Sequence, residues 1–244
     1  MIDMFMRSPL ENSLAVLVLV ALAVCLIGSF VVLFTDARIT DKKGWYMKLP
    51  PIFALLAVPA AVDLLQTKGI ALVFAIVAVL VLLAMIAIPL IQLFGKSNHP
   101  LIKDWFKWGI PALVLGELAV GGYFIYIKLA GGPVMCGPSQ GCGDVQNSPY
   151  AVLFGVLPVG VLGFMGAVAI LLAWLLWQFG PKSQRKLGAL GTWGFCIFGV
   201  LFSAYLTFLE PFVIGATCMW CITSAVFMIL LLLLANPAGQ QAIS

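Results

Sequence analysis

Long apolar stretches, separated by short polar connections, fill almost the whole chain. Most of them are close to 20 residues long, which lets an α-helix cross a hydrocarbon layer about 30 Å thick. Backbone amide and carbonyl groups cannot stay unpaired in lipid, so these stretches must be helical. The pattern predicts seven membrane spans: 12–35, 50–66, 69–94, 109–130, 150–178, 187–210 and 217–235.

The second of these segments, 50–66, carries the weakest signal. It is short, and it contains Pro50, Pro51, Pro59 and Asp63. Proline interrupts helices because it lacks a backbone N–H and collides with the preceding turn. The segment therefore has three readings: a full span, a half-helix, or a helix lying at the membrane interface.

The composition agrees with an all-α, polytopic membrane protein. Hydrophobic residues make up 63% of the 244 residues and charged residues only 9%, whereas about a quarter of the residues of a soluble domain are charged. A transmembrane β-barrel would instead show short segments of alternating hydrophobicity.

Basic residues are concentrated in three of the connections: 36–49, 95–108 and 179–186. The connection that contains Cys136 and Cys142 has only Lys128 at its edge. Because cytoplasmic loops carry the excess of lysine and arginine, we expect the cysteines outside and the basic loops inside an inner (plasma) membrane. This arrangement requires 50–66 to cross the membrane, giving seven spans with the N-terminus outside. It also explains the net charge of +4 without nucleic acid as a partner.

Two cysteines, Cys218 and Cys221, form a Cys-Met-Trp-Cys motif that opens the last apolar segment. Their spacing puts both sulfurs on one helical turn, and a thiolate at a helix N-terminus is stabilised by the aligned amides. A static staple is the plain alternative. A zinc site is another, but zinc needs four N or S ligands, and the only histidine, His99, is in a loop predicted on the other face. We therefore expect no metal.

The second pair, Cys136 and Cys142, brackets the run Gly-Pro-Ser-Gln-Gly. Glycine and proline favour a tight, mobile turn, and so short a loop gains little stability from a disulfide. The alternative is a disulfide that only shapes the loop. Two pairs on one face predict a relay, in which one pair meets a soluble partner and the other a compound dissolved in the bilayer. Cys25 and Cys196 lie inside apolar segments, where free cysteine packs as a small hydrophobic residue.

Two stretches of the chain resemble the vitamin K epoxide reductase family. The first runs from Cys136 through Ser148 to Gly163, and the second from Ser203 through the Cys-Met-Trp-Cys motif to Ser224. The resemblance covers residues 110–235, with the loop pair before the CxxC motif. A bacterial membrane oxidase with similar chemistry has its CxxC motif first.

The resemblance implies a four-helix bundle around a quinone, ubiquinone or menaquinone, with the loop folded over its outer mouth. It implies that Cys221 exchanges electrons with the quinone and that Cys218 passes the oxidising equivalent to Cys142. Cys136 would then face an external partner. Ser148 matches a polar residue near the entrance of the family's active site.

We expect the quinone pocket at the outer end of the last span, because Cys221 must reach a ring that partitions into lipid. The residues predicted to line it come from several segments: Phe154, Leu157, Tyr205, Trp220 and Ser224. Trp220 has a second reading as an anchor in the headgroup region.

Two acidic residues could assist this chemistry. Glu210 is close in sequence to the CxxC motif and would accept a proton released by a thiol, or else cap a helix end. Glu117 lies inside an apolar segment, where a carboxyl group is costly unless it is paired or protonated. It would deliver a proton to the quinone or be a neutral, hydrogen-bonded group within the bundle.

The predicted organisation has three parts: helices of unknown role in 1–108, the redox bundle in 109–235, and a short tail in 236–244. Many bacterial relatives continue into a thioredoxin-like domain, so a separate extracytoplasmic thioredoxin-fold partner is expected here. The predicted function is quinone-dependent oxidation of that partner's thiols. The alternative is an accessory subunit of a larger respiratory or photosynthetic membrane complex.

Overall fold

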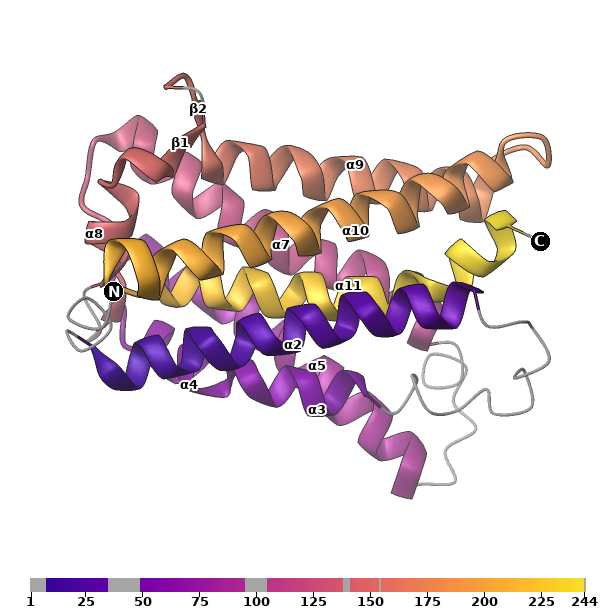
Figure 1. The fold of residues 1–244 in the computed structure, drawn as a ribbon, viewed down its shortest axis with the longest axis horizontal. Helices are drawn as coiled ribbons and strands as arrows, with labels where there is room; N and C mark the ends of the chain where they lie inside the picture. The colour runs from indigo at the N-terminus through magenta and orange to yellow at the C-terminus, as the bar shows by residue number, and fades with distance from the viewer. Residues whose placement is uncertain (1–7, 35–48, 95–104, 138–140, 154, 244) are drawn as a thin grey trace.

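The protein is almost entirely helical in the computed structural model, which describes residues 8–34, 49–94, 105–137, 141–153 and 155–243. Its long helices run roughly side by side (Figure 1): α2 (Pro9–Phe34), α5 (Ile70–Phe94), α7 (Trp105–Ala130), α9 (Val159–Phe179), α10 (Arg185–Leu209) and α11 (Met219–Ile243). In these described ranges, 6 helices are long and apolar enough to cross a membrane. The predicted all-α, polytopic architecture is confirmed.

The doubtful segment at 50–66 is a broken helix. It consists of α3 (Pro50–Ala54), a 3-10 turn η3 (Leu55–Ala57) and α4 (Val58–Leu64), and Pro59 stands in the first turn of α4. The segment returns the chain from the end of the molecule where α2 stops to the end where α5 starts (Figure 1). It is shorter than the six long helices, and a seventh span remains a prediction.

The predicted span 150–178 is wrong at its beginning, because α9 starts only at Val159. The preceding residues form a 3-10 turn η5 (Pro149–Ala151) and a small antiparallel hairpin of β1 (Val152–Leu153) and β2 (Leu157–Pro158). Gly155 has φ 71°, a left-handed conformation that suits a turn and not a helix. Apolar composition alone could not reveal this hairpin.

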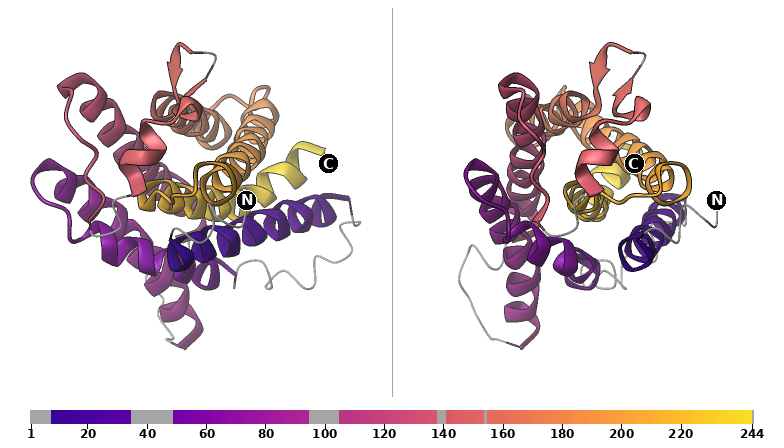
Figure 2. Two further views of the ribbon diagram at one scale, coloured as in Figure 1. Left: turned by 60° about the vertical axis from the view of Figure 1, so that its left-hand side comes forward. Right: turned by 90° about the vertical axis from the view of Figure 1, so that its left-hand side faces the viewer.

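Helix α11 is the core of the molecule. Every residue from Ile222 to Ala235 is buried except Ser224, and α2, α3, α4, α7 and α10 all pack against it. A helix that is apolar on all faces is stable when neighbouring helices enclose it, and Figure 2 shows α11 inside such a ring. The helix continues to Ile243, so the residues expected to form a tail are its last turns.

The C-terminal half of the chain forms a four-helix arrangement, as expected. Helix α9 packs against both α7 and α10, and α11 packs against both α7 and α10. The cysteine loop and the start of α11 lie at one end of this bundle (Figure 1). The α9–α10 connection, with Lys182 and Arg185, lies at the opposite end, so the helices separate the basic connection from the cysteines.

Candidate redox site

The CxxC motif occupies the first turn of α11. Cys218 directly precedes the helix, and its carbonyl accepts the N–H of Ile222 at 3.0 Å. Cys218 is completely buried, whereas Cys221 is partly exposed, and both are free thiols. The motif is therefore located at a helix start, as the sequence predicted.

The end of α10 brings Glu210 to this motif. A π-helical turn, η6 (Glu210–Ile214), follows α10, and Gly215 then reverses the chain with φ 76°. The buried Glu210 carboxyl accepts the backbone N–H of Cys218 at 3.1 Å and lies within hydrogen-bonding reach of the Cys221 thiol. Glu210 therefore satisfies an N–H at the helix start and lies beside the Cys221 thiol, and its role as a proton acceptor stays a prediction.

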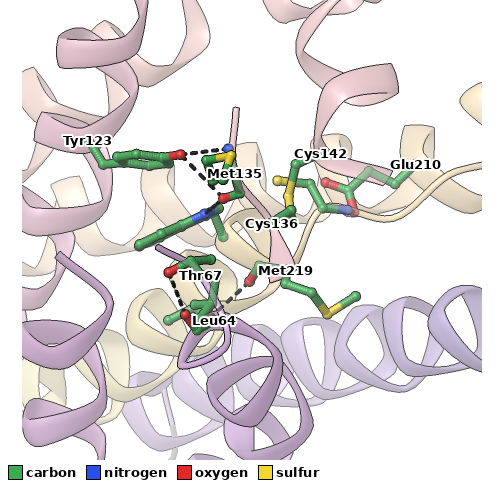
Figure 3. Close-up of a disulfide and its surroundings, with 11 residues drawn as sticks. Leu64, Thr67, Tyr123, Met135, Cys136, Cys142, Glu210 and Met219 are labelled. Carbon is green, nitrogen blue, oxygen red and sulfur yellow. Dashed lines mark hydrogen bonds between the residues drawn. A yellow bond between two sulfur atoms is a disulfide. The ribbon is translucent and has the colours of Figure 1, made fainter. Parts of the chain in front are cut away.

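The loop cysteines, Cys136 and Cys142, form a disulfide whose Cα atoms are 5.8 Å apart. Cys142 belongs to the short helix α8 (Gly141–Gln146), which lies over the start of α11. The sulfurs of Cys136, Cys142 and Cys218 all lie within 4.8 Å of one another. Figure 3 shows the disulfide with Met135 on one side, Glu210 on the other and the chain around Met219 below it. A free thiol is thus held next to a disulfide, the arrangement that thiol–disulfide exchange requires.

Three clustered sulfurs can also bind a metal ion. Zinc binds thiolates and is usually held by four ligands, whereas two of these three sulfurs are joined to each other. In this structure the cluster presents one free thiol beside a disulfide.

Two glycines allow the loop to approach its neighbours closely. A side chain at Gly137, next to Cys136, would collide with the backbone carbonyl of Asp63. A side chain at Gly141, next to Cys142, would collide with the carbonyl of Thr217. Each cysteine of the disulfide thus has a flanking glycine pressed against another segment, which keeps the disulfide over Cys218.

Two aromatic residues, Tyr123 and Trp220, hydrogen-bond to Met135, which precedes the first loop cysteine. The Met135 N–H donates to the Tyr123 hydroxyl at 2.7 Å, and the Trp220 indole N–H donates to the Met135 carbonyl at 3.0 Å. The two rings pack with their centroids 4.5 Å apart. Trp220 is fully buried within the protein, and its indole holds the loop entrance in place.

A buried hydrogen bond connects the N-terminal helix α2 to the redox site. The Thr217 hydroxyl donates to the Asn12 side-chain oxygen at 2.8 Å, across 205 positions of sequence. Both residues are completely buried. Because Thr217 precedes Cys218 and also supports Gly141, this bond ties α2 to the point where the two cysteine pairs meet. No local sequence pattern could have indicated it.

An apolar cavity opens on the other side of Cys221. It lies among α7, α9, α10 and α11, has a volume of about 100 Å³ and is partly open to the outside. Its walls include Phe124, Phe202 and Met228, with Cys221 at one end. The cavity has the apolar lining and the inter-helix position typical of cofactor sites in helical bundles.

A polar pair stands on this apolar wall. The Ser224 hydroxyl donates to the buried Glu117 carboxyl at 2.9 Å, and both residues line the cavity. Ser224 was expected there. Glu117 was expected either to deliver a proton to the quinone or to be a neutral, hydrogen-bonded group, and its position in the cavity depends on the packing of α7 against α11.

The other predicted pocket residues lie elsewhere. Tyr205 is 51% exposed and does not line the cavity, nor do Leu157 and Trp220. Phe154 lies outside the described residues. Ser148 lines a smaller neighbouring pocket together with Glu210 and Cys221, and its hydroxyl donates to the Val145 carbonyl at 2.7 Å. Phe202 and Gln146, which do line the cavity, carried no distinguishing sequence signal.

Comparison with known proteins identifies the part of the chain that holds all four of these cysteines. The profile of the vitamin K epoxide reductase family matches residues 128–236. Thiol-disulfide oxidoreductase LTO1 of Arabidopsis thaliana is 36% identical over 113 residues, which are 42% of this chain and 28% of that protein. The chain thus spans less than a third of the length of this relative. No solved structure matches the chain.

The Asn12–Thr217 bond leads to a stability prediction. Asn12→Ala should lower the free energy of unfolding by about 1–3 kcal/mol, because it leaves the buried Thr217 hydroxyl without its partner. Thermal unfolding of the detergent-solubilised protein would measure the loss. The double variant Asn12→Leu with Thr217→Val should recover part of it, since neither polar group then remains. If the free energies of unfolding lost in Asn12→Leu and in Thr217→Val add up to the loss in the double variant, the bond contributes nothing to stability.

Proposed function

Because residues 128–236 belong to the vitamin K epoxide reductase family, we propose that this chain is a membrane thiol–disulfide oxidoreductase that passes electrons from an extracytoplasmic thioredoxin-fold protein to a quinone. The observation that carries the proposal is the clustering of the Cys136, Cys142 and Cys218 sulfurs within 4.8 Å. The position of Cys221 on the wall of the apolar cavity supports the quinone end.

The first exchange takes place at the loop disulfide. A thiolate of the reduced partner attacks the Cys136 sulfur, the Cys136–Cys142 bond breaks, and Cys142 leaves as a thiolate. The partner's second thiol then attacks the mixed disulfide and releases Cys136. The partner leaves as a disulfide, and the loop pair has gained two electrons and two protons.

The second exchange moves these electrons to the CxxC motif. The Cys142 thiolate attacks Cys218 in a Cys218–Cys221 disulfide and releases the Cys221 thiolate, and Cys136 then resolves the Cys142–Cys218 bond. Glu210 is within hydrogen-bonding reach of Cys221 and serves as the local proton acceptor when this thiol is oxidised again.

The cavity fits a quinone on the evidence of its lining. Its walls are mainly apolar, and the Glu117–Ser224 pair supplies hydrogen-bonding groups that a ring oxygen would need. A quinone bound there, ubiquinone or menaquinone, would accept two electrons and two protons. In this proposal Phe124 and Phe202 hold the ring, and Cys221 faces it.

The relay can be tested by trapping its intermediate. In Cys221→Ser, the Cys218 thiol can attack Cys142 and release Cys136, but the onward attack by Cys221 is removed, so only the return attack by Cys136 can break the Cys142–Cys218 bond. We expect a Cys142–Cys218 disulfide in a substantial fraction of the molecules, seen as a linked peptide pair by non-reducing digestion and mass spectrometry. Cys196→Ser is the control, because Cys196 is buried within α10. If the Cys221→Ser protein contains Cys136–Cys142 bonds but no Cys142–Cys218 bond, the relay is contradicted.

The quinone step is tested by turnover with dithiothreitol as the electron donor. Cys221→Ala should reduce quinone-dependent turnover by roughly 10³-fold or more, as for loss of a nucleophile. Cys136→Ala should retain far more activity, because without the disulfide the loop no longer encloses Cys218 and a small dithiol can reach it. Equal loss in both variants would mean that the loop pair takes part in the quinone chemistry itself.

A matched pair on α10 tests the cavity. Phe202→Ala should raise the KM for quinone about five- to tenfold, as expected for loss of an aromatic contact worth about 1 kcal/mol. Tyr205→Ala should leave it unchanged, since Tyr205 does not line the cavity. If no dithiol supports quinone reduction by the unaltered protein, an accessory subunit of a larger membrane complex becomes the better proposal.

The charge pattern carries a prediction on topology. We propose that the basic connections face the cytoplasm of an inner (plasma) membrane and that both cysteine pairs face outward. After mild reduction of intact cells, a membrane-impermeant thiol reagent should therefore label Cys136. If Cys136 is labelled only after the membrane is disrupted, the cysteine pairs face the cytoplasm. An extracytoplasmic partner is then excluded. Cys25→Ser, at a buried position of α2, should leave the labelling unchanged.

A further inference from the structure

A groove beside the loop disulfide is built from two parts of the chain that are far apart in sequence. One wall is the turn Gln66–Lys68, between α4 and α5, and the other is the segment Val134–Gly137. Figure 3 shows Thr67 next to Met135 and Cys136. The first wall lies outside the region that the family profile matches.

The groove leads to one sulfur of the disulfide and not to the other. Cys136 lines it, whereas Cys142 does not and is completely buried. Cys136 is itself only 4% exposed, so a flat protein surface cannot reach its sulfur. A narrow, protruding segment that carries a thiol can reach it between the two walls.

The turn that forms the first wall is held in a defined conformation. The Thr67 hydroxyl donates to the Leu64 carbonyl at 2.7 Å, at the end of α4. Gly69 has φ 66°, which lets the chain turn sharply into α5. The close contact between Asp63 and Gly137 holds the two walls together.

Lys68 gives this groove its charge. It is exposed, and it is the charged side chain among the described residues that line the groove. Asp63 lies behind Gly137 and is not part of the lining. An ammonium group at this position attracts both an incoming thiolate and acidic residues that flank it.

We propose that this groove is the docking site for the thiol partner, and that Lys68 selects a partner segment with acidic residues around its reactive cysteine. The inference rests on the proposed function and gives the N-terminal helices a role in it: they supply the wall that determines which dithiol reaches Cys136. The reaction is the first exchange above, in which the partner's thiolate bonds to Cys136 and Cys142 is released.

The test compares two reduced peptides that differ only in charge: Glu-Glu-Cys-Gly-Pro-Cys-Glu and Lys-Lys-Cys-Gly-Pro-Cys-Lys. Quinone-dependent oxidation of each is measured at low salt, with dithiothreitol as an uncharged reference. The variant is Lys68→Glu. The control is Lys128→Glu, an exposed lysine in the last turn of α7 that does not line the groove.

The unaltered protein should have the lower KM for the acidic peptide. Lys68→Glu should shift the ratio of the two KM values by about three- to tenfold toward the basic peptide, as expected for reversal of one exposed charge. The shift should shrink at high salt because of screening. Lys128→Glu should leave both the ratio and the turnover with dithiothreitol unchanged.

A second readout separates failure of this inference from failure of the proposed function. Single-cysteine versions of the two peptides form mixed disulfides with Cys136 whether or not a quinone is reduced, and mass spectrometry measures the rate. If dithiothreitol supports no quinone reduction, the proposed function fails, while the peptide preference still tests the groove. An unchanged preference in Lys68→Glu, or an equal change in Lys128→Glu, would overturn the docking site.

Discussion

The enclosure of α11 is the constraint on which the rest of this structure depends. The helix is apolar around its whole circumference, so it is most stable when other helices cover every face. Helices from both halves of the chain provide this cover. The enclosed helix begins at the CxxC motif, and its N-terminus is therefore fixed in position before any redox chemistry takes place.

The fixed helix start determines where the loop must lie. On one side, the Glu210 carboxyl accepts the backbone N–H of Cys218. On the other, the Trp220 indole N–H donates to the Met135 carbonyl at the start of the loop. Gly137 and Gly141 remove the side chains that would keep the disulfide away. The short distances among three sulfurs follow from these contacts. Such preorganisation raises the effective concentration of one thiol near its target disulfide.

The N-terminal helices also contact the residues next to the cysteines. Asn12 of α2 binds the residue before Cys218, and the carbonyl of Asp63 rests against the residue after Cys136. These helices therefore support both cysteine pairs of the proposed relay, although the family profile does not include them. Their contacts with α11 and with the loop give the N-terminal helices a way to influence the positions of the cysteines.

The sequence by itself determined the helical class, the approximate spans and the four cysteines, because each depends on local properties. Apolar length and the spacing of Cys218 and Cys221 are visible without any knowledge of packing. Ser224 and Glu210 could also be predicted, since one follows the CxxC motif by a turn and the other is an acid near it in the chain.

Only the tertiary structure decided which residues meet across the bundle. Tyr205 and Phe202 are both aromatic residues of α10, and only the rotation of that helix directs Phe202 to the cavity and leaves Tyr205 exposed. Trp220 was assigned to the pocket because it stands between two reactive cysteines, yet its indole binds Met135 instead. The Asn12–Thr217 bond and the wall formed by Gln66–Lys68 join positions far apart in the sequence. Such contacts arise from the way α11 is enclosed, and no local pattern of residues encodes them.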